Sequence, residues 1–195
     1  MRYMAFKSLP LLSLFLLLSA CAGSVTPPAR YMLPSSPMIS APTQPQGTLQ
    51  LRPPRLAHYL DVDGIVMQLN DITLNAAREH QWAESLGRQL ERSLRSHLAQ
   101  ELTYIQVIRD DGNTPNALTL SLEVDQFQGR YDGVAIASGQ WQLRGTNNEL
   151  LALEGFTAET ELDEDGYPAL VRALGKSWHS VASQIANQIR QGDYF

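Results

Sequence analysis

The only cysteine of the chain, Cys21, is the residue for which the surrounding sequence most clearly indicates a chemical role. It stands directly after Leu18-Ser19-Ala20, and the small residues at the last two of these positions suit the narrow subsites of a signal peptidase. Upstream, Arg2 and Lys7 form a basic stretch, and residues 11–18 form an apolar run that is too short to span a bilayer. This arrangement is typical of a secretory signal peptide.

Leu18-Ser19-Ala20-Cys21 is similar to the lipobox of bacterial lipoproteins. The resemblance implies that diacylglycerol is attached to the Cys21 thiol, that the chain is cleaved before Cys21 and that the new N-terminus is acylated. One acyl chain binds a membrane only marginally, whereas two or more hold firmly, so three chains make detachment negligible. The alternatives are an uncleaved anchor and an ordinary signal peptide followed by a chance cysteine.

Ala22 follows the cysteine, where lipoproteins of the enteric type that stay in the inner membrane usually carry Asp. By the same resemblance, the mature protein is expected at the outer membrane, facing the periplasm. The only cofactor-like groups expected are the covalent diacylglycerol and N-acyl chain on Cys21.

The four histidines are the next candidates for chemistry, and they are His58, His80, His97 and His179. None has a second His or Cys three or four residues away, so the sequence predicts no metal pair. Two distant histidines can still meet in space, but His97 and His179 are interpreted as residues that cover the edges of the core. We therefore predict no metal site.

The acidic motifs do not predict catalysis either. Asp61-x-Asp63-Gly64 resembles the start of a calcium loop, but the later ligands are missing and a turn is favoured. The acidic residues of 161–165 are interpreted as a solvated loop rather than as a cation site. The chain has no nucleophile elbow, Walker loop or dinucleotide fingerprint, so we predict that it is not an enzyme.

The net charge and composition of the chain restrict the classes of partner that it can bind. Removing residues 1–20, which hold two basic residues and no acidic one, moves the net charge from −5 to −7. This balance argues against binding to nucleic acid or adsorption to anionic headgroups. With Cys21 acylated, no disulfide can form within the chain, so stability must come from an apolar core, for which a hydrophobic fraction of 44% is sufficient.

The sequence divides into three parts: a signal peptide at 1–20, a lipidated cysteine and tether at 21–47, and a globular periplasmic domain at 48–195. The tether is rich in Pro, Ser and Thr and cannot form a packed core. Inside it, residues 30–33 form an apolar island, for which an edge strand and plain linker are both open.

Residues 65–69 and 72–74 are predicted to form a hairpin, and 104–108 a short strand. The clearest alternation runs over 118–124, followed by strands over 134–144 and 150–160, with a bulge expected at Gly155. An amphipathic helix is predicted from Glu79, with an apolar stripe that includes Trp82, and a second one over 168–192. The predicted fold is α+β, a mainly antiparallel sheet with both amphipathic helices packed on one face.

Gly129 to Gly133 is the segment with the strongest functional interest. In the simpler explanation, its two glycines serve a tight turn and Tyr131 packs on the sheet. In the alternative, Arg130 and Tyr131 face a partner, because these residue types are enriched where binding energy concentrates.

Several motifs in fixed order resemble one family over nearly the whole mature chain: residues 31–34, 59–61, 64–66 and 127–133, the Trp82 segment, and 138–141. This family is the ABC-type transport auxiliary lipoproteins, most closely their PqiC-like (YmbA-like) branch. The resemblance implies an accessory subunit beside transporters that carry MCE domains and move lipids between the inner and outer membranes. Its expected partner is a periplasmic MCE-domain tunnel protein.

Two functional hypotheses follow. In the first, the domain is an adaptor that docks the tunnel protein to the outer membrane and supports membrane integrity, with a ring of identical copies as one arrangement. In the second, the domain is a lipid-binding carrier with an apolar cavity between helices and sheet. The even alternation of the strands favours the adaptor, and a filled core would support it further. A lipoprotein that stabilises the envelope without transport is a weaker third alternative.

Overall fold

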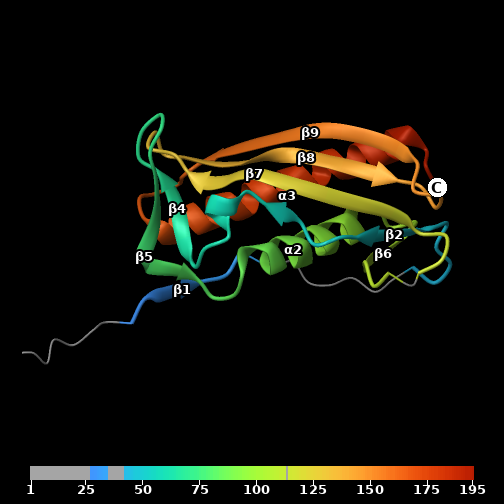
Figure 1. Ribbon diagram of the computed structural model, residues 1–195, viewed down its shortest axis with the longest axis horizontal. Coiled ribbons are helices and arrows are strands. Elements are labelled where there is room, and N and C mark those ends of the chain that lie inside the picture. Colours follow the sequence, from blue (N-terminus) through green and yellow to red (C-terminus); the bar gives the residue numbers. More distant parts are fainter. Residues whose placement is uncertain (1–26, 35–41, 113) are drawn as a thin grey trace, which may run out of the picture.

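The computed structural model describes residues 27–34, 42–112 and 114–195. Cys21 and the rest of the lipobox lie outside these residues. The described chain forms one nine-stranded sheet and two long helices (Figure 1), which confirms the α+β class. In the described part of the chain, no helix is both long enough and apolar enough to cross a membrane.

The organising strand is β7 (Leu118–Gly129), whose alternation was the clearest in the sequence. Along one edge it pairs in parallel with three short strands, β2 (Thr48–Leu51), β3 (Arg55–Leu56) and β4 (Gly64–Gln68). The prolines between β2 and β3 and the 3-10 turn η2 (His58–Leu60) break this edge into short pieces. β6 (Gln106–Arg109) extends the sheet beyond β2, also in parallel. The sheet is therefore mixed, with antiparallel pairing in the two longest ladders and between β4 and β5 (Leu74–Trp82).

The other edge of β7 carries the antiparallel meander with β8 (Val134–Arg144) and β9 (Leu150–Glu161). The prediction of a bulge at Gly155 was wrong, because Gly155 pairs with Gln140 in unbroken register. The irregularities lie at Asp125 in β7, between Val124 and Gln126, and at the far end of the β8–β9 ladder. Phe156 and Ala158 face the core directly, whereas Leu153 lies exposed.

The second hairpin joins β4 to β5 (Leu74–Trp82), as the sequence predicted for its first strand. The expected helix start at Glu79 was wrong, because β5 continues to Trp82 and the helix begins only at Leu86. His80 consequently lies on a strand and not on the first helix. β1 (Ala29–Tyr31) pairs in parallel with the end of β5, so the apolar island in the segment 21–47 forms an edge strand.

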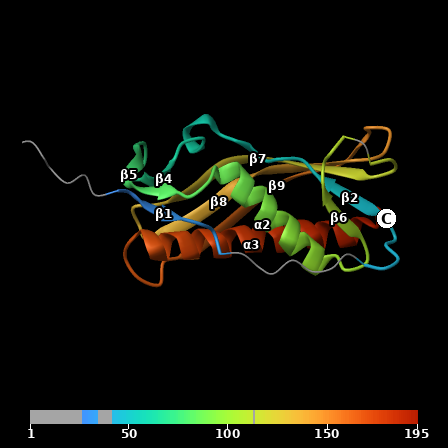
Figure 2. The same ribbon diagram turned by 90° about the horizontal axis from the view of Figure 1, so that it is seen from below.

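The helices α2 (Leu86–Glu101) and α3 (Tyr167–Gly192) lie on the same side of the long strands (Figure 2). Pro168 stands in the first turn of α3, where its missing N–H costs nothing, as the sequence indicated. The predicted stripes are buried: Leu90, Leu94 and Leu98 on α2 are fully buried, as are Trp178 and Ile185 on α3.

The space between the helices and the sheet is filled with large side chains. Trp178 is fully buried, and its indole N–H donates to the Leu90 carbonyl at 3.1 Å. Its ring meets Phe127 and Phe156 edge to face, at centroid distances of 5.9 and 6.1 Å. Trp141, from β8, fills the other end and donates to Gln188 on α3. This interior is a packed core.

Candidate functional site

The residues of the N-terminal segment closest to Cys21 in the described chain are held by the domain. Tyr31 lies on β1, and its hydroxyl is 2.9 Å from Nδ1 of His80. The His80 ring stacks on Tyr167 at the start of α3, with a centroid distance of 4.0 Å. Leu33 is buried, and its backbone N–H donates to Oε1 of Gln89, a buried side chain on α2, at 2.8 Å. The segment that leads to Cys21 is therefore attached to β5, α2 and α3.

Both glycines of the segment between β7 and β8 have a structural reason. A Cβ at Gly129 would lie 2.4 Å from the Met67 sulfur and 2.9 Å from Leu170, so any larger residue there would force these two side chains to move. Gly133 has φ of 82°, a conformation that costs glycine little. Gly133 therefore serves a tight turn, as the simpler explanation expected, whereas Gly129 ends β7 and is explained by packing. The part of that explanation in which Tyr131 packs on the sheet was wrong, because its side chain is exposed.

The two candidate partner-binding residues, Arg130 and Tyr131, lie in this turn in different environments. The Arg130 guanidinium donates to both carboxylate oxygens of Asp132, at 3.1 and 2.7 Å, and to Glu159 on β9 at 2.5 Å. These pairs raise the pKa of Arg130, chiefly through the bonds to Asp132, and they lower the pKa of Asp132. Arg130 is engaged within its own chain, whereas the Tyr131 side chain is 62% exposed.

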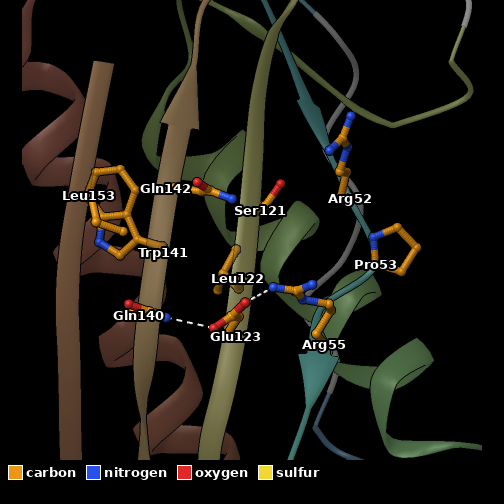
Figure 3. Close-up of a pocket in the computed structure, with 10 residues that line it drawn as sticks. All are labelled: Arg52, Pro53, Arg55, Ser121, Leu122, Glu123, Gln140, Trp141, Gln142 and Leu153. Atoms are coloured by element: carbon orange, nitrogen blue, oxygen red, sulfur yellow. Dashed lines mark hydrogen bonds and ion pairs between the residues drawn. The ribbon is translucent and has the colours of Figure 1, made fainter. Parts of the chain in front are cut away.

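A shallow depression of about 410 Å³ lies on the side of the sheet away from the helices (Figure 3). Its walls come from the β2–β3 connection and from β7, β8 and β9. Both of its arginines are paired: Arg55 with Glu123, and Arg52 with Asp110 at 3.0 Å. Glu123 also accepts a hydrogen bond from Gln140 at 2.6 Å (Figure 3). The depression offers neutral hydrogen bonding and one apolar wall, but it has no pair of groups arranged for acid–base catalysis.

The structure brings two of the four histidines together. His97 on α2 and His179 on α3 meet edge to face, with ring centroids 4.3 Å apart, and both helices present them near the helix–helix seam. Burial lowers the pKa of His97, and the neighbouring His179 lowers it further, while Glu101 acts in the opposite direction. Within the described residues, no group of three or more His, Cys, Asp or Glu side chains is placed to hold a metal ion.

The acidic loop before α3 is tied to that helix. Asp163 accepts from Lys176 at 2.7 Å, and Glu164 from Arg172 at 2.7 Å. The bond from Lys176 lowers the pKa of Asp163. These exposed pairs help to position the loop, and their contribution to stability is small.

Two residues with structural roles were missed in the sequence. The Tyr59 hydroxyl lies 2.7 Å from the Asp125 carbonyl and 2.6 Å from Oε1 of Gln128, and it thereby supports the bulge in β7. Burial raises the pKa of Tyr59, and the charge of Asp125 adds to this effect. Gln89 was not among the residues that the sequence singled out. A clue was available for Tyr59, which belongs to the motif at 59–61 that carries the family resemblance, but no sequence pattern pointed to Gln89.

The fold is a packed α+β domain that follows a lipobox-like N-terminus in the sequence. Among the residues that the structure describes, the polar side chains discussed above are paired with one another and not arranged for catalysis. The model of the ABC-type transport auxiliary lipoprotein component matches residues 31–186, and the chain belongs to this family. It is 30% identical over 177 residues to the intermembrane transport lipoprotein PqiC of Escherichia coli K12, covering 89% of this chain and 92% of that protein. PqiC of Shigella flexneri matches to the same extent. The family and these relatives are named for transport and not for catalysis.

Two solved structures share the fold. One, the crystal structure of an uncharacterized protein, is 27% identical with a TM-score of 0.74, over 84% of this chain and 99% of that chain. The other, from Xanthomonas campestris, is 19% identical with a TM-score of 0.67, over 84% and 96% of the two chains. The second likeness concerns the fold alone.

Proposed function

We propose that this protein is an accessory subunit of an MCE-type intermembrane lipid transport system, anchored in the outer membrane through acylated Cys21 and facing the periplasm. In this role it docks the periplasmic tunnel protein and supports membrane integrity. The observation that carries the proposal is the 30% identity to the intermembrane transport lipoprotein PqiC along 89% of the chain. Because nearly the whole relative is covered, the likeness includes the full domain and not one shared motif.

The packed interior supports an adaptor over a carrier. A carrier needs a dry cavity large enough for acyl chains between helices and sheet. Here that space holds Trp178, Phe127 and Trp141, each at most 1% exposed. Opening it for a lipid would require displacing the aromatic contacts that join α3 to β7 and β9.

The way in which the N-terminal segment is held also fits an adaptor. A lipoprotein that transmits position from a membrane to a partner works best when its anchor joins the domain at a fixed place. The bonds from Leu33 to Gln89 and from Tyr31 to His80 supply such a fixed junction within 12 residues of Cys21. Of the two candidate contact residues, Tyr131 keeps an exposed ring that is free to make an outside contact, and Arg130 acts by holding the turn.

The test is a pull-down of the full, acylated protein from solubilised membranes, with mass spectrometry of the proteins and lipids that come with it. The proposal expects an MCE-domain protein and no stoichiometric lipid other than the anchor. A Cys21→Ala variant is the control for the anchor, and its own mass reports whether the acyl chains are missing. A stoichiometric lipid in the absence of a protein partner would contradict the adaptor and favour the carrier.

A further inference from the structure

The connection between β4 and β5 exposes an unusual concentration of large apolar side chains. Leu69 is 54% exposed, Ile72 87% and Leu74 41%. The loop is well formed: the Asn70 side-chain oxygen accepts from the backbone N–H groups of Ile72 and Thr73 at 3.0 and 2.9 Å. The Leu69 N–H donates to the Thr73 carbonyl at 2.8 Å. The loop therefore presents these side chains on a fixed frame.

Tyr131 belongs to the same end of the molecule. Met67 of β4 pairs with Gly129 of β7, so the chain that continues to Leu69 runs beside the chain that continues to Tyr131. Both views place the β4–β5 connection and β1 toward the same end of the long axis, although β1 pairs with the other end of β5 from that connection (Figures 1 and 2). We call Leu69, Ile72, Leu74 and Tyr131 the apolar tip. Exposed apolar side chains are ordinary when scattered, but a cluster on one protrusion marks an interaction surface.

The charges around the apolar tip restrict what it can meet. Residues 61–77 include Asp61, Asp63 and Asp71 but no Lys or Arg. The nearest arginine on the β7–β8 turn, Arg130, is already paired with Asp132 and Glu159. The next basic residue, Arg78 on β5, is exposed but is outnumbered by these three aspartates. The surroundings of the tip therefore do not favour an anionic surface, and the surface that fits is apolar with neutral, zwitterionic headgroups. The Asp71 carboxylate limits the depth of insertion to the headgroup region.

The length of chain before β1 brings a membrane within reach. Ala29 is the eighth residue after Cys21, and at 3.3–3.6 Å per residue this length of chain spans at most about 29 Å. An acylated Cys21 thus keeps β1 within that distance of the bilayer surface. Aliphatic side chains with a neighbouring tyrosine are the composition that settles at a membrane interface.

We propose that the apolar tip inserts into the headgroup region of the zwitterionic bilayer in which the acyl chains of Cys21 are embedded. The tip supplies a second contact, and the two contacts together fix the orientation of the domain on the membrane. This inference rests on the acylation of Cys21 in the proposed function. It makes the bilayer surface the contact of the exposed Tyr131 ring.

The test uses the full, acylated protein in phosphatidylcholine vesicles. An Ile72→Cys variant carries a single environment-sensitive fluorophore, because the Cys21 thiol is occupied by diacylglycerol. The control is Asn147→Cys, in the β8–β9 connection at the opposite end of the molecule (Figure 1). The proposal expects a blue shift at position 72 and loss of its emission when the vesicles contain spin-labelled lipid, with neither effect at position 147.

A matched pair of variants separates the tip from general surface hydrophobicity. With the fluorophore at 72, Leu69→Ser combined with Leu74→Ser is expected to abolish the quenching. Leu150→Ser combined with Leu153→Ser removes two comparably exposed leucines of β9 and should leave it unchanged. All four side chains are exposed, so neither pair should disturb folding. Adding phosphatidylglycerol should not strengthen the signal.

The outcomes distinguish this inference from the function on which it rests. Protein that does not float with vesicles at all would contradict the acylated anchor and with it both proposals. Protein that floats while position 72 stays in water would overturn the tip contact and leave the adaptor standing. A third outcome is that position 72 is shielded from water without lipid quenching, and only when a second copy or the tunnel protein is present. That result would make the tip a protein interface and would also overturn the inference.

Discussion

His97 lies on the buried side of α2, with its ring edge against His179. Its pKa is lowered by burial and then by the His179 ring, so the folded state resists protonation at this site. The unfolded chain takes up a proton near the ordinary histidine pKa of about 6.5. Between the two pKa values the unfolded state binds more protons, and the free energy of unfolding therefore decreases as the pH falls below about 6.5.

We expect His97→Gln to flatten this pH dependence between pH 7 and the lower pKa. The measurement is urea unfolding at a series of pH values, and His58→Gln, which removes an exposed ring from η2, is the matched control. An unchanged slope in His97→Gln would show that other groups cause the loss of stability in acid.

Gly129 offers a second prediction at the scale of one residue. Replacing it by alanine places a methyl group against Met67 and Leu170, where β4, β7 and α3 meet. Overpacking of this kind costs about 1–3 kcal/mol of unfolding free energy. Gly155→Ala is the control, because the nearest heavy atom to its new Cβ lies 3.8 Å away. Equal stability of the two variants by denaturant unfolding would contradict the close packing at Gly129.

At the scale of elements, the strand β1 depends on one buried amide. Gln89 accepts from the Leu33 N–H and donates to the Glu84 carbonyl at 3.0 Å. Gln89→Ala leaves the buried Leu33 N–H without its acceptor, a loss of about 1–3 kcal/mol. We expect faster hydrogen exchange at Leu33 and Tyr31, with the long β7–β8 ladder unaffected.

The control for this prediction is Gln191→Ala, which removes an exposed glutamine near the end of α3. Exchange rates in β1 that stay the same in Gln89→Ala would mean that the pairing with β5 alone holds the strand. In that case the junction between tether and domain would be less rigid than the adaptor requires.

Elements whose faces differ sharply were predictable from the sequence, and those defined by distant partners were not. The bounds of β8 and the end of α3 at Gly192 follow directly from alternation and from the apolar stripe. Trp82 misled because it stands four residues before Leu86, in phase with the helix, although it is buried as the last residue of a strand. The parallel partners of β7 are set by tertiary packing, which no local pattern records.

The same limit applies to the candidate site. The sequence indicated Tyr131 and the tight turn beside it, because glycines and aromatic residues are recognisable locally. It did not reveal that Arg130 is committed to Asp132 and Glu159, since Glu159 lies 29 residues further along the chain. Nor did it reveal that the β4–β5 connection shares an end of the molecule with that turn, because the pairing of Met67 with Gly129 creates this proximity.

At the scale of the whole molecule, β1 joins the N-terminal segment to a domain whose filled core makes it a rigid body, and we propose that acylated Cys21 anchors this body. The central claim is that this body holds a transport partner at the outer membrane. Family membership and the likeness to PqiC support the transport role, and the packed aromatic core supports a mechanical role over that of a carrier.

The most direct measurement is density-gradient fractionation of envelopes from cells that make either the natural protein or Cys21→Ala, followed by quantification of the MCE-domain protein in each membrane fraction. We expect the natural protein in the outer-membrane fraction, together with part of the tunnel protein. We also expect the Cys21→Ala variant, although still folded, to be missing from the outer-membrane fraction. The amount of tunnel protein in that fraction should decrease with it. Natural protein in the inner-membrane fraction, or an unchanged distribution of the tunnel protein in Cys21→Ala, would contradict the claim.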